Sequence, residues 1–296
     1  MAAPLVFDRR LVRRRLGRAL KGGYADFLLA RAIEDIHERL GTVLRHFPRA
    51  LDVGTPTAAL AQWLSASGRV DEVVRLAPAE EPGHGLTVLG DAEALPFGPE
   101  RFDLAVSLLA LQSVNDLPGA LIQVRRALKP DGLFLGCLLG GATLHELRHA
   151  FTHAEAELEG GASPRIAPFA DVSDLGGLLQ RAGFALPVAD VEPVTVRYRD
   201  PSGLLRDLRA MGLTNALLDR RKTPLRRATL LRALDIYAER FAGADGRVRA
   251  TFDMAWLSGW APHASQQKPL RPGSAKVRLA DALGVQEHSA GKVPRR

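Results

Sequence analysis

The chain has 296 residues, of which 46% are hydrophobic and 25% charged, as in an ordinary globular protein. This length suits one large α/β domain with insertions or two small domains. The net charge of +7 comes mostly from arginines spread along a chain with only 6% aromatic residues, and this argues against a nucleic-acid surface. The single cysteine, Cys137, excludes an internal disulfide framework, and no apolar run is long enough to span a bilayer.

Residues 1–25 are rich in arginine and lead directly into a helical pattern. Helical spacing places four apolar residues on one face, namely Leu28, Ala32, Ile36 and Leu40. We therefore expect residues 1–44 to form an N-terminal helical flap whose arginines lie on a solvated face. An organelle-targeting peptide is the alternative, although Asp8 interrupts the basic stretch.

Residues 50–58 are the stretch around which the rest of the chain is organised. A short apolar run and an acid precede Gly54, and a helical pattern begins at Ala59. Strand, tight turn and helix in this order open a nucleotide-binding α/β unit, because a glycine lets a ligand approach the backbone closely. The usual S-adenosylmethionine (SAM) pattern is acid-x-Gly-x-Gly-x-Gly. Here Pro56 and Ala58 replace the second and third glycines, so we expect weakened SAM binding.

The next two predicted strands are followed by a second candidate cofactor residue, Asp91, whereas the expected ribose-binding acid is not evident. In dinucleotide sites an acid about 20 residues past the glycine turn binds the ribose, but here Glu80 and Glu81 come slightly late. Asp91 directly follows the third strand, where its carboxylate can accept the adenine amino group while the Ala92 N–H donates to a ring nitrogen. The alternative is that Asp91 caps a helix.

Apolar runs and helical patterns then alternate, as is typical of a parallel sheet with crossover helices. The expected strands are residues 50–53, 70–76, 86–89, 102–109, 133–139, 188–198 and 249–260, with a turn over 128–132. The predicted fold is thus α/β with a seven-stranded, mostly parallel sheet. The expected segments are a flap (1–44), a core (45–200), a helical insertion (201–248), a final strand (249–260) and an extended or disordered tail (261–296).

The helix expected over residues 143–158 contains His145-Glu146-x-x-His149, with His153 one turn later. This spacing can bind zinc, with the glutamate as general base. We favour no metal site, because so short a pattern arises by chance and the Gly-x-x-His continuation is absent. The basic helix over 225–241 is expected to pack on the domain, and peripheral membrane contact is its alternative.

With these residues in hand, the chain resembles the class I SAM-dependent methyltransferases and, more closely, the complex I assembly factor family with that fold. The matching stretches are residues 7–9, 91–97, 114–118, 128–132, 140–148, 159–169, 174–176, 211–215, 265–269 and 272–275. The resemblance implies a Rossmann-like methyltransferase sheet of order 3-2-1-4-5-7-6 with its last strand antiparallel. It also implies SAM as cofactor and hydroxylation of an arginine in an iron–sulfur subunit of NADH dehydrogenase (complex I), which would be the partner. Gln112 and Ser113 depart from the His-Trp or similar pair often found in the family.

The residues leave the function open among a SAM-dependent methyltransferase, the implied hydroxylase and assembly role, and a non-catalytic assembly chaperone. The malonyl-carrier methyltransferase of biotin synthesis is a further alternative. No catalytic residue is assigned. The expected location is the cytoplasm of a bacterium, or the mitochondrial matrix of a eukaryote. The expected cofactor-binding residues are Asp52, Gly54, Thr55, Asp91, Ala92 and Leu108.

Overall fold

The computed structural model describes residues 5–81, 85–267, 277, 281 and 284–285. Residues 1–262 form one compact unit, and 263–296 are separated from it as a second. Most of the predicted tail, 261–296, lies outside the described residues. The strands of the first unit are β1 (Phe47–Val53), β2 (Val70–Ala77), β3 (Leu86–Leu89), β4 (Phe102–Leu108), β5 (Leu128–Leu139), β6 (Ala185–Tyr198) and β7 (Val248–Trp260). Its helices are α1 (Arg9–Lys21), α2 (Phe27–Gly41), α3 (Ala59–Ala66), α4 (Leu117–Ala127), α5 (His145–Glu159), α6 (Val172–Arg181), α7 (Pro201–Ala210) and α8 (Arg227–Phe241), with a 3-10 turn η1 (Leu111–Ser113).

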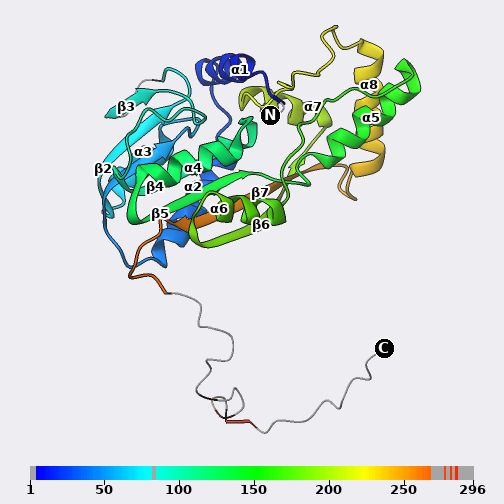
Figure 1. Cartoon of the computed structure of the whole chain (residues 1–296). Helices are drawn as coiled ribbons and strands as arrows, with labels where there is room; N and C mark the ends of the chain where they lie inside the picture. Colours follow the sequence, from blue (N-terminus) through cyan, green and yellow to red (C-terminus); the bar gives the residue numbers. More distant parts are fainter. Residues whose placement is uncertain (1–4, 82–84, 268–276, 278–280, 282–283, 286–296) are drawn as a thin grey trace. The chain divides into compact units, whose positions relative to one another are not determined.

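Within the described residues, seven strands form one sheet of order β3-β2-β1-β4-β5-β7-β6 (Figure 1). The strands from β3 to β5 pair in parallel, and β7 is antiparallel to both of its neighbours. The fold prediction is therefore confirmed, including the strand order and the antiparallel last strand. The chain order places the switch point between β1 and β4, where ligands of open α/β sheets bind at the carboxyl ends of the strands.

One local prediction is wrong. The stretch 128–132 was expected to be a turn, but β5 begins at Leu128, which pairs with Phe102. Residues 128–132 interrupt the regular pairing of β5 with β4. The register shifts between Phe102 and Leu104 of β4, and Asp131 has a φ of 62°. Pairing with β4 thus extends through a sequence whose local preference is a turn.

Two apolar clusters cover the two faces of the sheet. One contains the buried sides of α2, α3, α5, α7 and α8, and the other contains those of α4 and α6. The strands of this sheet read as nearly continuous apolar runs because both faces are covered. The central strand β4, for example, has Leu104, Val106 and Leu108 in the first cluster and Ala105 in the second.

The predicted flap divides into two parts. Helix α2 packs in the first cluster, with Leu28 and Ile36 essentially inaccessible to solvent. Helix α1 instead lies beside α7, and the residues before it pair with the loop after α7 through a Phe7–Leu217 bridge. None of the helices in the described part of the chain is long and apolar enough to cross a bilayer.

Candidate cofactor and substrate site

The glycine turn after β1 is built around a single left-handed residue. Gly54 has a φ of +75°, which L-residues rarely adopt, and a Cβ placed there would meet the Ala110 Cβ at 3.4 Å. The buried Arg75 of β2 braces the turn, since its Nη2 lies 3.3 Å from the carbonyl oxygens of both Thr55 and Pro56. The turn therefore keeps its tight geometry although Pro56 replaces a glycine.

Asp52 and Arg75 form a buried pair beneath this turn. The parallel register of β1 and β2 places them opposite one another, and Arg75 Nε lies 3.8 Å from Asp52 Oδ2. Among the described residues neither of these two atoms has a hydrogen-bond partner. Burial raises the pKa of Asp52 to about 7, although a hydrogen bond from Thr55 and the Arg75 charge both lower it. The Arg75 guanidinium also holds Glu81 at 2.8 Å, so this late acid is paired inside the protein.

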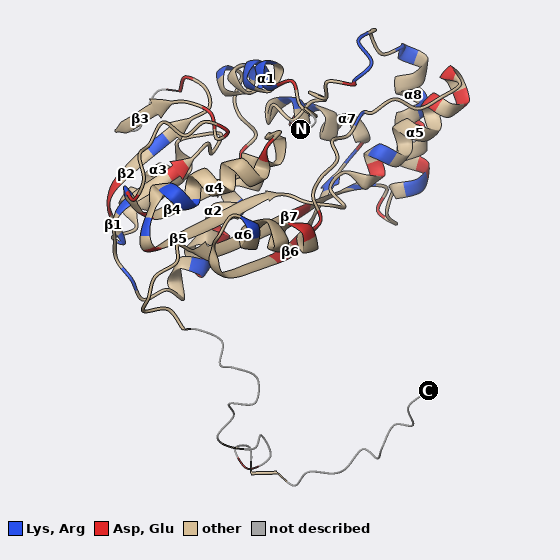
Figure 2. Cartoon of the chain, in the orientation of Figure 1, with Lys and Arg blue, Asp and Glu red and all other residues tan. Residues whose placement is uncertain are grey.

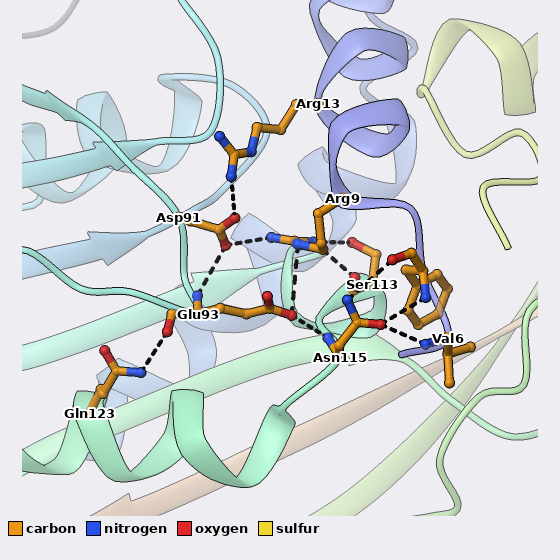
Figure 3. Close-up of polar contacts among 9 residues, drawn as sticks. Val6, Arg9, Arg13, Asp91, Glu93, Ser113, Asn115 and Gln123 are labelled. Atoms are coloured by element: carbon orange, nitrogen blue, oxygen red, sulfur yellow. Dashed lines mark hydrogen bonds and ion pairs between the residues drawn. The ribbon is translucent and has the colours of Figure 1, made fainter. Parts of the chain in front are cut away.

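Two arginines of α1 clamp Asp91 at the carboxyl edge of β3. Arg9 Nη2 lies 2.6 Å from Asp91 Oδ1 and Arg13 Nη2 lies 2.7 Å from Oδ2 (Figure 3). The Glu93 N–H also donates to the carboxylate, at 3.0 Å. Burial alone would raise the pKa of Asp91, but these three donors outweigh it and the pKa is lowered. The carboxylate therefore stays ionised, in a partly buried double ion pair.

Asn115 fixes the chain just before α1 over the same edge. Its Oδ1 accepts the N–H groups of Val6 and Phe7 at 2.8 and 2.7 Å, and its Nδ2 donates to the Phe7 carbonyl at 3.2 Å (Figure 3). Its own N–H donates to the Glu93 carboxylate. The N-terminal segment thus closes over the carboxyl edge of the sheet through specific polar contacts.

This arginine clamp was not predicted from the sequence. Arg9 and Arg13 were assigned to a solvated face, and Arg13 is indeed 52% exposed. A usable signal was their spacing of four residues, which places both guanidinium groups on one side of a helix.

A small cavity lies between the clamp and the glycine turn. Its volume is about 70 Å³, and its lining includes Gly54, Pro56, Asp91, Ala92 and Ala110. The glycine cradle and the carboxylate at the strand end are the features that suit a SAM cofactor. The volume falls well below the roughly 300 Å³ at the lower end of ligand pockets. The residues present therefore fit the cofactor, whereas Arg9 and Arg13 of α1 occupy the carboxylate that it would use and leave little space beside it.

A larger, apolar cavity of about 360 Å³ adjoins the small one. Side chains from α5, α7 and α8 line it, among them Leu147, Phe151, Leu205, Leu208 and Leu230, together with the loop residue Phe169. The two cavities share Val12, Gln112, Ser113, Leu139, Gly212 and Leu213. A group held in the apolar cavity would thus lie next to the cofactor edge, which is the arrangement that group transfer requires.

Comparison with known proteins agrees with this geometry. A methyltransferase-domain family model matches residues 51–136. The arginine-hydroxylase NDUFAF5 of Danio rerio is 41% identical, with alignment of 93% of this chain and 89% of that protein. The Homo sapiens protein of the same name is 39% identical, with 93% and 83% aligned. The chain belongs to the class I methyltransferase family that includes the NDUFAF5 arginine-hydroxylases.

Other members of this family carry a different name. A malonyl-[acyl-carrier protein] O-methyltransferase of Halorhodospira halophila is 35% identical, with 94% of this chain and 95% of that protein aligned. Among solved structures, the YcgJ protein of Bacillus subtilis has a TM-score of 0.51 at 17% identity, with 80% of this chain and 99% of that one aligned. The [4+2]-cyclase SpnF also has a TM-score of 0.51 at 17% identity, with 88% and 98% aligned. These two structures support the fold alone.

In this methyltransferase-fold chain, the predicted cofactor residues divide into two groups. Gly54, Asp91 and Ala92 line the small cavity. Asp52, Thr55 and Leu108 are instead fully buried behind it, and the Leu108 N–H donates to Thr55 Oγ1 at 3.2 Å. These three residues support the turn, and direct contact of any of the six with a cofactor stays a prediction.

In the histidine-rich helix α5, the glutamate of the His-Glu-x-x-His stretch, Glu146, has a structural role. Glu146 is fully buried and accepts the Thr251 hydroxyl at 2.6 Å and the Thr251 N–H at 3.1 Å, which ties α5 to β7. His149 and His153 lie side by side, with ring centroids 4.1 Å apart. Among the described residues no group of three or more His, Cys, Asp or Glu side chains could hold a metal ion.

Proposed function

We propose that this protein is a SAM-dependent enzyme of the methyltransferase fold that modifies a protein side chain during assembly of NADH dehydrogenase. The single observation that carries the proposal is the 41% identity to an NDUFAF5 arginine-hydroxylase across 93% of the chain. That similarity extends beyond the common sheet to the segments that line the apolar cavity. The partner is then an iron–sulfur subunit of that complex, and the modified residue is an arginine.

The chain's own residues supply binding and orientation. The backbone at Gly54 would give the cofactor a close approach. Asp91 with the Ala92 N–H would hold its adenine once the ion pairs of Arg9 and Arg13 with this carboxylate open. When bound, SAM would supply an electrophilic methyl group for methyl transfer. Hydroxylation of an arginine would instead need an oxidant such as O2 together with a reductant, which SAM does not supply. The adjoining apolar cavity would take the aliphatic part of the substrate side chain next to this edge and exclude water from it, while the guanidinium group would stay outside the apolar lining. Proximity of this kind needs no acid–base pair, and none is assigned here.

The relatives named as arginine-hydroxylases are mitochondrial proteins. For this chain we propose the mitochondrial matrix if the source is a eukaryote, and the cytoplasm if it is a bacterium.

Deletion of the gene tests the proposal. We expect reduced NADH dehydrogenase activity, recovery of the iron–sulfur subunit by affinity capture, and loss of hydroxylation of one arginine of that subunit by mass spectrometry. Complementation with Asp91→Ala should fail, whereas Asp219→Ala, a change of an exposed aspartate, should succeed. Normal complex I in the deletion strain would overturn the proposal. If Asp91→Ala restores assembly, the protein acts as a non-catalytic chaperone.

A second candidate function is methylation of an acyl-carrier substrate. Two observations favour it, the 35% identity to a malonyl-[acyl-carrier protein] O-methyltransferase and the apolar character of the larger cavity. Growth of the deletion strain without biotin decides the matter. A biotin requirement that this gene relieves would support the second candidate, and unaffected growth with defective complex I would support the first.

A further inference from the structure

A basic groove adjoins the apolar cavity at the carboxyl end of α7. The groove has a volume of about 640 Å³ and lies between α1 and α7. It shares Arg209 and Thr214 with the 360 Å³ apolar cavity, so that the two spaces meet at these residues. Nothing in the proposed activity uses this groove.

Four arginines line the groove: Arg15, Arg18, Arg206 and Arg209. In the described part of the chain none of them forms an ion pair with a carboxylate, and the groove lining contains no acidic residue. Arg15 donates to the carbonyl oxygens of Thr214, at 2.7 Å, and Asn215, while Arg206 donates to Ser202 Oγ at 2.8 Å. Figure 2 shows Lys and Arg concentrated on α1, which forms one wall. Asp8 acts on Arg15 and Asp200 acts on Arg206 from outside the lining, so the groove is a positive site that is only partly compensated.

The electrostatics of Arg15 agree with this picture. Burial lowers the pKa of Arg15, and the neighbouring charges of Arg220, Arg14 and Arg18 lower it further, against a smaller opposite effect of Asp8. Like charges brought together in this way favour an anion between them.

The adjoining cavity, in contrast, is lined mainly by apolar side chains. Its described lining contains no aspartate or glutamate, and its charged side chains are Arg165 and Arg209. Arg165 is neutralised by the buried Glu155, which accepts from its Nε at 2.9 Å. Arg209 has no such partner among the described residues and lies on the border with the groove. A cationic ligand would find no counter-charge in this lining, whereas an uncharged chain would replace water at apolar walls.

We propose that the cavity and the groove together bind an amphiphilic anion, with its acyl chain in the apolar cavity and its carboxylate or phosphate on Arg209 and the neighbouring arginines. The cavity volume lies in the range of pockets that bind small organic ligands, roughly 300–1,000 Å³. This binding requires neither SAM nor the proposed modification activity, so each can fail without the other, and because both use the apolar cavity the acyl chain would compete with the substrate side chain.

Calorimetry on the whole chain with three matched probes tests the ligand chemistry. We expect decanoate to bind, decanol to bind more weakly, and decyltrimethylammonium to bind least. Decyl phosphate should behave like decanoate, which shows that the anion and not the carboxyl group is recognised. Equal affinity for the anion and the cation would overturn the proposal. Binding only to anionic phospholipid vesicles, without binding of soluble decanoate, would overturn it in favour of a membrane-surface role.

Variants separate the two parts of the site. Arg209→Gln should weaken decanoate binding about tenfold or more and leave decanol binding unchanged, because only the charged contact is lost. Arg181→Gln, a change of an exposed arginine on α6, is the control of equal charge and should alter neither. Ala216→Phe narrows the cavity and should weaken both ligands together. An unchanged decanoate affinity in Arg209→Gln contradicts the proposal whether or not Ala216→Phe folds.

Discussion

The ion pairs of Arg9 and Arg13 with Asp91 predict the direction in which the affinity for SAM changes when one of them is removed. In the structure the cofactor edge is closed, because α1 brings Arg9 and Arg13 onto the carboxylate and leaves a cavity of only about 70 Å³. Binding of adenine to Asp91 would require these ion pairs to open, and their free energy opposes that opening. We predict that Arg13→Gln tightens SAM binding, since it weakens the closed state and frees one oxygen of Asp91.

The magnitude follows from the exposure of the pair. Arg13 is 52% exposed and makes a single contact with Asp91, at 2.7 Å. Exposed ion pairs of this kind contribute about 0.2–1 kcal/mol. The same free energy shifts the fraction of binding-competent molecules, and the dissociation constant should fall by roughly 1.4- to fivefold. Arg9 is the poorer test because it also donates to the Ser113 carbonyl at 2.8 Å.

Isothermal calorimetry with SAM, on protein freed of co-purified ligand, measures the effect. Arg14→Gln is the matched control, since it removes the same charge from the exposed neighbouring position on α1 and should leave the affinity unchanged. Weaker SAM binding by Arg13→Gln would refute the reasoning. In that case α1 closes over the bound cofactor and its arginines belong to the binding site.

The other predictions concern the turn and the buried acids. Pro56→Gly should tighten SAM binding roughly tenfold or more in the same calorimetric assay, because it restores a backbone donor, and unchanged affinity would show that this N–H does not face the ligand. Asp52→Asn should abolish a pH dependence of unfolding. The pKa of Asp52 is about 7 when folded and about 3.9 when unfolded, so only the folded state keeps the proton between these values. Urea denaturation should therefore show the wild type losing stability relative to the variant as pH rises from about 4 to 7, by at most about 1.4 kcal/mol per pH unit, and parallel curves would count against the buried protonated acid. Glu155→Gln should destabilise the fold by about 1.5–3 kcal/mol, because a buried carboxylate that accepts from Ser163 and Arg165 is lost. Glu157→Gln, a surface change on the same helix, is the control, and equal urea midpoints for these two variants would contradict the assignment.

The sheet could be predicted from local patterns because each central strand is apolar on both faces. The runs at residues 102–108 and 133–139 gave β4 and most of β5 in this way. The start of β5 could not be predicted, since residues 128–132 favour a turn and only pairing with β4 extends the strand through them. The strand order came from the resemblance to a known family rather than from any local pattern.

In the candidate site, too, some features follow from the local sequence and others from the tertiary structure. The sequence by itself marked Gly54 and Asp91 as candidates, because a turn glycine after a strand and an acid at a strand end are recognised by their immediate neighbours, and both line the small cavity. Only the tertiary structure decided that Arg9 and Arg13 hold Asp91, 82 and 78 residues away, since an arginine on a helix carries no sign of the partner that it will meet. It also decided that Arg75 braces the glycine turn, because the register of β1 against β2 places that side chain opposite Asp52. Local features follow from the chain's nearest neighbours, whereas long-range ion pairs and cavities exist only after the sheet has brought distant residues together.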